Sequence, residues 1–247
     1  MNPILFHYGG FAIHYSEVIF AGSFFLSYFL SFRRARALGF ADPEWERALL
    51  YYAAAGLLGS RVGYILAHVR MFEGRWAEAL TPWPGAFTLW GALLGFLAAA
   101  QILRHIQRYD SGRSLDVLAP VFSLFLGLAE WGLFTEGEGW GRAAKGLLAL
   151  QEGGVARYPL WLGYSLWFLL TAGVLALRPP KREGTSFAYL SASLGLATLA
   201  FSPFTLLYGN TAGRYVWGSL AVCAGLGYVL FQAKRPTAAE RERKEPS

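Results

Sequence analysis

Residues 130–142, with the sequence EWGLFTEGEGWGR, place three carboxylates and one arginine beside a long apolar stretch. The carboxylates belong to Glu130, Glu136 and Glu138, and Arg142 ends the run. Carboxylates crowded together in surroundings of low dielectric oppose one another's ionisation, so such a cluster is a candidate for acid/base chemistry. The alternative is a solvated loop in which the same groups face water.

A second candidate pair lies near the outer end of the first apolar stretch. His14 and Glu17 are three residues apart, and this spacing puts both side chains on one face of a helix. The pair could pass a proton between its members. It could equally be a hydrogen-bonded pair at the membrane interface, where both groups are tolerated.

A third candidate, Arg61, lies inside the apolar segment GLLGSRVGYILAHV. An arginine at that depth must find an anion, a group of carbonyls or water. One interpretation is an ion pair with Asp116 or Glu130. The other is a lipid phosphate, whose oxygens fit the planar guanidinium. Gly59 and Gly63 would let a neighbouring helix approach closely.

The elements that must position these residues are seven apolar stretches of about 18–22 residues. At 1.5 Å per residue, each helix spans about 30 Å, the thickness of a bilayer's hydrocarbon core. We therefore predict an all-α integral membrane protein with seven transmembrane helices in one domain, residues 1–233. The predicted spans are 11–32, 49–69, 85–103, 115–134, 158–177, 186–204 and 215–232.

The basic residues predict the orientation. Of the 22 Lys and Arg residues, 15 fall in the loops after the first, third and fifth spans and in the C-terminal tail, and 6 fall on the other side. Cytoplasmic loops carry the excess of Lys and Arg, so the N-terminus is expected outside and the C-terminus in the cytoplasm. The charged tail 234–247 is expected to be disordered.

Residues 135–157 then form an outer loop. Its glycines at 137, 139 and 141 predict backbone that turns tightly or approaches another group closely. A short amphipathic helix over 143–150 is also possible. The N-terminal residues 1–10 are expected to form a short interfacial segment.

Composition argues against several other classes. The net charge of +6 is explained by cytoplasmic flanking bases, and no soluble basic domain is present to bind nucleic acid. The four histidines are scattered and there is a single cysteine, so neither a metal site nor a cofactor is expected. A transporter or channel remains an alternative, but no span shows the glycine-proline break expected at a midplane ion site.

Five segments of the chain form a recognisable series of motifs: GFAIHYSEVIFAGSFFLSYFLSFRRARALG, GSRVGYIL, LWGALLGFLAAAQILRHIQRYDSGRSLDVLAP, GLAEWGLFTEGEGWGR and RYPLWLGYSL. Their order and spacing resemble the prolipoprotein diacylglyceryl transferase family over essentially the whole chain. That family comprises seven-span enzymes of the bacterial inner membrane. In them, the cysteine thiol of a lipoprotein precursor attacks the glycerol carbon of phosphatidylglycerol, and glycerol phosphate leaves.

The resemblance implies roles for several residues. Arg61 and Arg142 would hold the lipid phosphate, and Glu138 or His14 would be the base for the thiol. We also expect one outer-leaflet cavity, open sideways to lipid, on which four charged residues converge: Arg61, Glu130, Glu138 and Arg142. Glu17, Glu136 and Trp140 are further candidates for this cavity. The implied partners are phosphatidylglycerol and the signal peptide of a lipoprotein precursor.

This chain departs from the family pattern at several positions. Trp90 stands where the family has a histidine, Glu130 where it has an arginine, and Leu133 and Glu136 where it has asparagines. Ser16 falls on the position of a tyrosine. Two functions therefore remain open: a transferase of lipoprotein biosynthesis, or an inactive or repurposed relative that binds lipid or a membrane partner.

Overall fold

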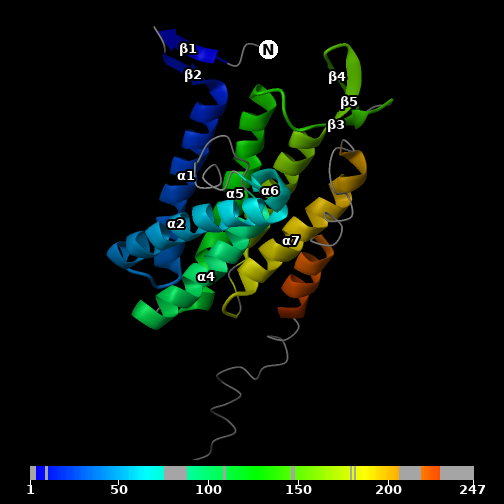
Figure 1. Ribbon diagram of the computed structural model, residues 1–247. Coiled ribbons are helices and arrows are strands. Elements are labelled where there is room, and N and C mark those ends of the chain that lie inside the picture. The colour runs from blue at the N-terminus through cyan, green and yellow to red at the C-terminus, as the bar shows by residue number, and fades with distance from the viewer. Residues whose placement is uncertain are drawn as a thin grey trace, which may run out of the picture. The chain divides into compact units, whose positions relative to one another are not determined.

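The structure is a computed structural model, and it describes residues 4–8, 11–74, 88–107, 110–145, 148–178, 180, 182–205 and 218–228. Most of these residues are helical, as predicted. The principal helices are α1 (Tyr15–Ala37), α2 (Asp42–Ala67), α4 (Leu89–Gln107), α5 (Ser111–Thr135), α6 (Leu160–Leu177) and α7 (Thr185–Phe201). The first five are each long and apolar enough to cross a membrane, and α7 reaches that length together with the 3-10 turn that follows it, as Thr185–Phe204. The chain is therefore a multi-pass membrane protein (Figure 1).

The seventh predicted span, residues 215–232, is described only in part. Its described portion is an apolar helix, Gly218–Tyr228, which by itself is shorter than a membrane crossing. The tail 234–247 lies outside the described residues. Two short 3-10 helices, η1 (Val69–Phe72) and η2 (Ser202–Phe204), extend the ends of α2 and α7.

Small strands occur where the sequence predicted a span end or a helix. Strands β1 (Ile4–Tyr8) and β2 (Phe11–His14) pair in antiparallel fashion, so the first helix begins at Tyr15 rather than near residue 11. Strands β3 (Trp140–Ala143), β4 (Leu150–Glu152) and β5 (Val155–Pro159) form an antiparallel sheet in the order β3-β5-β4.

The amphipathic helix expected over 143–150 is therefore wrong. Gly153 and Gly154 connect β4 to β5 with φ values of 56° and 82°. Two successive residues with positive φ match the right-handed twist of a hairpin, so this glycine pair favours strands on either side. The sheet lies between α5 and α6 in the chain order, and Figure 1 shows it beside the upper end of α6.

The chain divides into two compact units, residues 32–117 and residues 1–31 with 118–247. In the first unit, α2 packs tightly along α4. A Cβ built on Gly59 would meet the backbone of Gly91 and Gly95, and one on Gly95 would meet the carbonyl of Ala55. Small residues at such a seam let two backbones approach, which confirms the expectation for Gly59.

The same unit buries a polar group of side chains. A hydrogen bond of 2.5 Å joins the hydroxyls of Tyr52 and Ser114, and both residues are buried. Asp116 is fully buried as well, and its charge attracts that of Arg34. Ion pairing and hydrogen bonding allow these groups to leave water.

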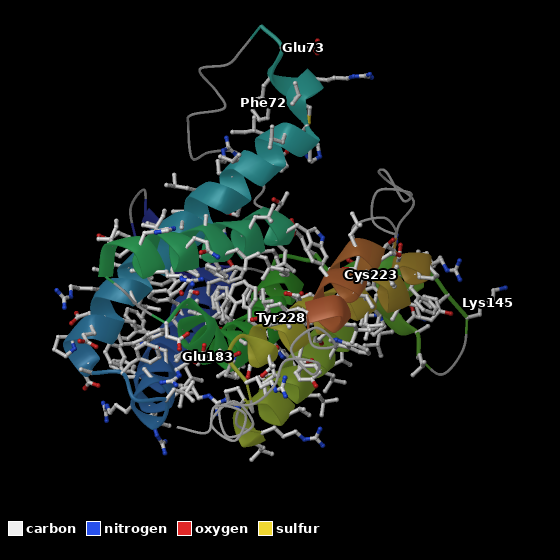
Figure 2. All side chains as sticks on the ribbon, turned by 90° about the horizontal axis from the view of Figure 1, so that it is seen from below. Phe72, Glu73, Lys145, Glu183, Cys223 and Tyr228 are labelled. Atoms are coloured by element: carbon white, nitrogen blue, oxygen red, sulfur yellow. The ribbon has the colours of Figure 1, made fainter. Side chains whose placement is uncertain are left out.

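In the second unit, α7 packs against α6 and against the helix Gly218–Tyr228. Trp167 of α6 donates its indole N–H to the Ser193 hydroxyl of α7 at 2.9 Å. A Cβ on Gly195 would lie 2.5 Å from the Gly218 carbonyl oxygen. Tyr228 donates its hydroxyl to the Glu183 carbonyl at 3.0 Å, and Figure 2 labels both residues. The helix 218–228 thus packs as closely as a membrane helix does.

Because α2 and α4 pack so closely, a methyl group added between them should reduce the stability of the protein. Gly95→Ala should lower the melting temperature in detergent, because its Cβ would push against the Ala55 carbonyl, and overpacking of this kind costs about 1–3 kcal/mol. Gly173→Ala in α6 is the matched control, since nothing lies within 4 Å of its Cβ. Thermal unfolding followed by circular dichroism checks this. Equal melting temperatures for the two variants would show that the seam is not tight.

Candidate functional site

The C-terminal end of α5 turns sharply and fixes the direction of the acidic run. Gly137, with φ of 78°, donates its N–H to the Phe134 carbonyl at 3.0 Å, and Glu138 donates its N–H to the Leu133 carbonyl at 2.9 Å. This is the Schellman pattern that ends many helices, and its left-handed residue is usually glycine. The tight turn expected at residue 137 is confirmed. Glu136 occupies the C-cap position.

Glu136 contacts the start of α1. Its Oε1 accepts a hydrogen bond from the Ser16 hydroxyl at 2.5 Å and lies 3.4 Å from Nδ1 of His14. Ser16 is buried, whereas about a third of each of the His14 and Glu136 side chains is exposed. The structure therefore joins His14 to Glu136, two predicted site residues that are far apart in the sequence.

Close packing of the two helices makes this contact possible. A Cβ on Gly132 of α5 would lie 3.1 Å from the ring of Phe20 and 3.4 Å from the Ser16 carbonyl oxygen. Glycine at this position lets α5 approach α1 one turn before Glu136. Sequence reasoning noted Ser16 only as a departure from the family pattern and did not identify it as a site residue, because a lone serine in an apolar helix carries no chemical signal of its own.

Glu17 has a structural role at the start of α1. Its Oε2 accepts the backbone N–H of His14 at 3.1 Å. This is half of a capping box, in which a glutamate in the first turn satisfies the N–H of the residue that begins the helix. The bond goes to the backbone of His14 rather than to its ring, which favours the structural interpretation of Glu17.

Trp140 belongs to an aromatic cluster that also contains Trp131, Phe134 and Trp161. The ring centroids of Phe134 and Trp161 lie 4.3 Å apart, and those of Phe134 and Trp140 lie 6.2 Å apart. Trp161 donates its backbone N–H to the Gly139 carbonyl at 2.9 Å. Trp140 thus helps to dock the segment after α5 onto the start of α6. Trp161 was not predicted, since it lies at the edge of an apolar span.

The glycines of this segment approach other groups closely, as expected. A Cβ on Gly139 would lie 2.7 Å from the Cβ of Trp161, and one on Gly141 would lie 2.5 Å from the Phe204 carbonyl oxygen. Arg142 follows, with its guanidinium 5.8 Å from the centre of the Phe204 ring. Arg142 and Glu138 are exposed, while Glu130 is half-buried within α5.

Arg61 belongs to the other unit. Its guanidinium is half-buried and lies 5.8 Å from the Tyr64 ring centre and 5.9 Å from that of Phe72. Both contacts are of the cation–π kind. Asp116 is one of the two partners expected for Arg61, and its negative charge interacts favourably with the guanidinium of Arg34. The gathering of Arg61 with Glu130, Glu138 and Arg142 stays a prediction.

Among the described residues, no three His, Cys, Asp or Glu side chains are grouped so that they could hold a metal ion. The chemistry that the site offers is that of a histidine and a carboxylate in contact, with an exposed carboxylate and an exposed guanidinium on the adjoining segment. A histidine and a carboxylate in contact can accept and hold a proton. A guanidinium can bind phosphate oxygens.

Residues 3–201 match the family model described as prolipoprotein diacylglyceryl transferase. The chain belongs to this family. It is 28% identical to the phosphatidylglycerol–prolipoprotein diacylglyceryl transferase of Leptothrix cholodnii, with 94% of this chain and 81% of that protein aligned. For the protein of the same name from Gluconobacter oxydans the identity is 27%, with 95% and 94% aligned. For that of Thermotoga maritima it is 26%, with 95% and 86% aligned.

Because the segment after α5 docks onto Trp161, alanine substitutions at two glycines of similar φ should differ in their effect on stability. Gly139→Ala should lower the melting temperature more than Gly154→Ala, because only at Gly139 does the new Cβ meet Trp161, while the φ values are 76° and 82°. The free energies of unfolding of the two variants should differ by about 1–3 kcal/mol. Near-ultraviolet circular dichroism should also change only in Gly139→Ala, since the tryptophan cluster lies there. Matching spectra and melting temperatures would contradict the docking.

Proposed function

We propose that this protein transfers the diacylglyceryl group of phosphatidylglycerol to the cysteine of a lipoprotein precursor in the bacterial cytoplasmic membrane. Family membership over residues 3–201 and the names of the relatives support this activity. The structural observation that carries it is the contact of His14 with Glu136. In this contact an imidazole and a carboxylate lie together at the start of an apolar helix, and about a third of each side chain is exposed.

The reaction needs a base, a phosphate-binding group and access from the lipid. The thiol loses its proton to the base, and its sulfur forms a bond to the glycerol carbon of the lipid. The bond between that carbon and the phosphate oxygen breaks, and glycerol phosphate leaves with the electron pair. A neutral thiol is a weak nucleophile, so removal of its proton is the step that a base accelerates.

The candidate base is His14 or Glu138, and Arg61 and Arg142 are the candidate ligands of the phosphate. The exposure of Arg142 and its position three residues after the turn at Gly139 are compatible with headgroup binding. Glu130 is the residue least suited to an anionic lipid, because a carboxylate near the phosphate would repel it.

The alternative is a relative that binds lipid or a membrane partner without turnover. Two residues favour this alternative. Trp90 cannot serve as a base because indole accepts no proton, and Glu130 cannot hold the lipid phosphate because a carboxylate does not bind phosphate. On this alternative, the contact between His14 and Glu136 would serve binding or stability alone.

An assay of the purified protein in vesicles, with labelled phosphatidylglycerol and a lipobox peptide, distinguishes the transferase from a relative that only binds lipid. A thioether product is expected from the wild type, and its rate should fall about 100-fold or more in Arg142→Ala, because charge at a phosphate site is lost. Arg178→Ala, at the C-terminal end of α6, is the control cation. Stoichiometric lipid binding without product would support the alternative and overturn the transferase.

We further propose seven spans in one domain over 1–233, with the N-terminus outside and the tail 234–247 in the cytoplasm. The basic loops and the packing of the helix 218–228 on α7 support this arrangement. In a Cys223→Ser background, a cysteine introduced at position 2 should react with an impermeant maleimide added outside the cell. One introduced at position 240 should react only after the membrane is opened. Labelling of both from outside would require an even number of spans.

A further inference from the structure

We infer that Glu136 is a positioning residue that holds His14 as the base for the thiol, and that Ser16 holds Glu136 in place. This inference deepens the proposed transferase function and rests on it. It selects His14 over Glu138 as the base. His14, Ser16 and Glu136 form a trio where the start of α1 meets the end of α5.

On this inference, the Glu136 carboxylate is the acceptor in both of its hydrogen bonds. Oε1 of Glu136 lies 2.5 Å from the Ser16 hydroxyl and 3.4 Å from Nδ1 of His14. An ionised carboxylate only accepts, so the proton of a neutral His14 must reside on Nδ1. The lone pair is then on Nε2, which becomes the atom that can take a proton from a thiol.

Two helices position the Glu136 carboxylate: α1 through the Ser16 hydroxyl, and α5 through the backbone of Glu136 itself. Ser16 is buried in the first turn of α1, so its hydroxyl is a fixed donor. Glu136 is the C-cap of α5, and the turn at Gly137 fixes its backbone. A side chain locked in this way can orient a neighbouring imidazole, because little of its own freedom remains to be lost.

Helix stability does not account for a glutamate at this position. The C-terminal end of a helix carries partial negative charge, which disfavours a nearby anion and favours a nearby cation. Glu136 stands at that end of α5. The arrangement instead suits a positive charge on His14, which appears when the ring takes a proton.

The proton can be followed through the reaction. Nε2 of His14 takes it from the thiol as the sulfur forms its bond to the glycerol carbon and the phosphate oxygen leaves with its electrons. Glu136 at the ring and Glu17 at the His14 backbone are the carboxylates that face the transient imidazolium. The imidazolium then returns the proton to the leaving glycerol phosphate, and neutral His14 is restored.

The positioning itself is tested without turnover, by nitrogen-15 NMR of histidine-labelled protein in detergent. The chain has four histidines, so His14→Gln assigns the His14 signals. The wild type should show the tautomer with the proton on Nδ1. Glu136→Ala should shift the population towards the Nε2 tautomer, and Glu152→Ala, in the sheet, should not. An unchanged tautomer in Glu136→Ala would overturn the inference.

The kinetic test is a double-mutant cycle in the vesicle assay. His14→Gln should lower kcat about 100-fold or more, as loss of a general base does. Glu136→Gln keeps the size of the side chain but removes its charge, and it should lower kcat about 10-fold or more while KM for phosphatidylglycerol stays within about twofold. The double variant should be no slower than His14→Gln alone, because Glu136 acts only through His14.

The outcomes separate the two proposals. If the loss of kcat in the double variant equals the product of the losses in the two single variants, Glu136 acts independently of His14. That result would overturn the inference and leave the transferase intact. A wild type with no turnover would overturn the transferase, and with it the catalytic use of the trio, whatever the tautomer is. Full kcat in Ser16→Ala together with an unchanged His14 tautomer would remove Ser16 from the inference.

Discussion

An unpaired polar group costs far more in hydrocarbon than in water, and the rest of the structure depends on meeting that constraint. Hydroxyls inside the spans donate to carbonyls of their own helices, as Ser23 does to Ile19 and Thr198 to Leu194. Between helices, Ser123 donates to the Phe168 carbonyl. Charged groups follow the same rule, with Asp116 attracting Arg34 in one unit and Glu136 accepting from Ser16 in the other. Each of these described polar groups thus has its partner within its own unit.

The glycines allow this pairing because they bring backbones close enough for polar groups to meet. Gly132 lets α5 approach α1 beside the Ser16–Glu136 bond. In the other unit, α2 and α4 approach at Gly59 and Gly95, and there Thr88 donates its hydroxyl to the Ser60 carbonyl at 3.1 Å. Apolar attraction between helices is weak when the solvent is itself apolar, so close approach and hydrogen bonds take its place. The short side chains of the sequence therefore matter as much as its charges.

Much of this could be predicted from the sequence, and the limits have physical causes. Length and hydropathy predict most of the helices, because the bilayer fixes the number of residues that a span requires. They did not predict β4 and β5, since a short hairpin is stabilised by its Gly153–Gly154 turn and by pairing, and an apolar run such as GLLAL is compatible with either a helix or a strand. The glycine positions predicted the turn at Gly137 and the close contact at Gly139. The partner of Glu136 was beyond reach, because Ser16 lies 120 residues away and contact depends on how α1 and α5 pack.

We propose that the lipid reacts where the start of α1 meets the end of α5. Photo-cross-linking tests it most directly, with a phosphatidylglycerol that carries a diazirine in its glycerol headgroup. Mass spectrometry of the cross-linked peptides should place the label within residues 11–20 and 130–142, and excess unlabelled phosphatidylglycerol should abolish it. Labelling spread evenly along the apolar helices, with no competition by unlabelled lipid, would contradict the account.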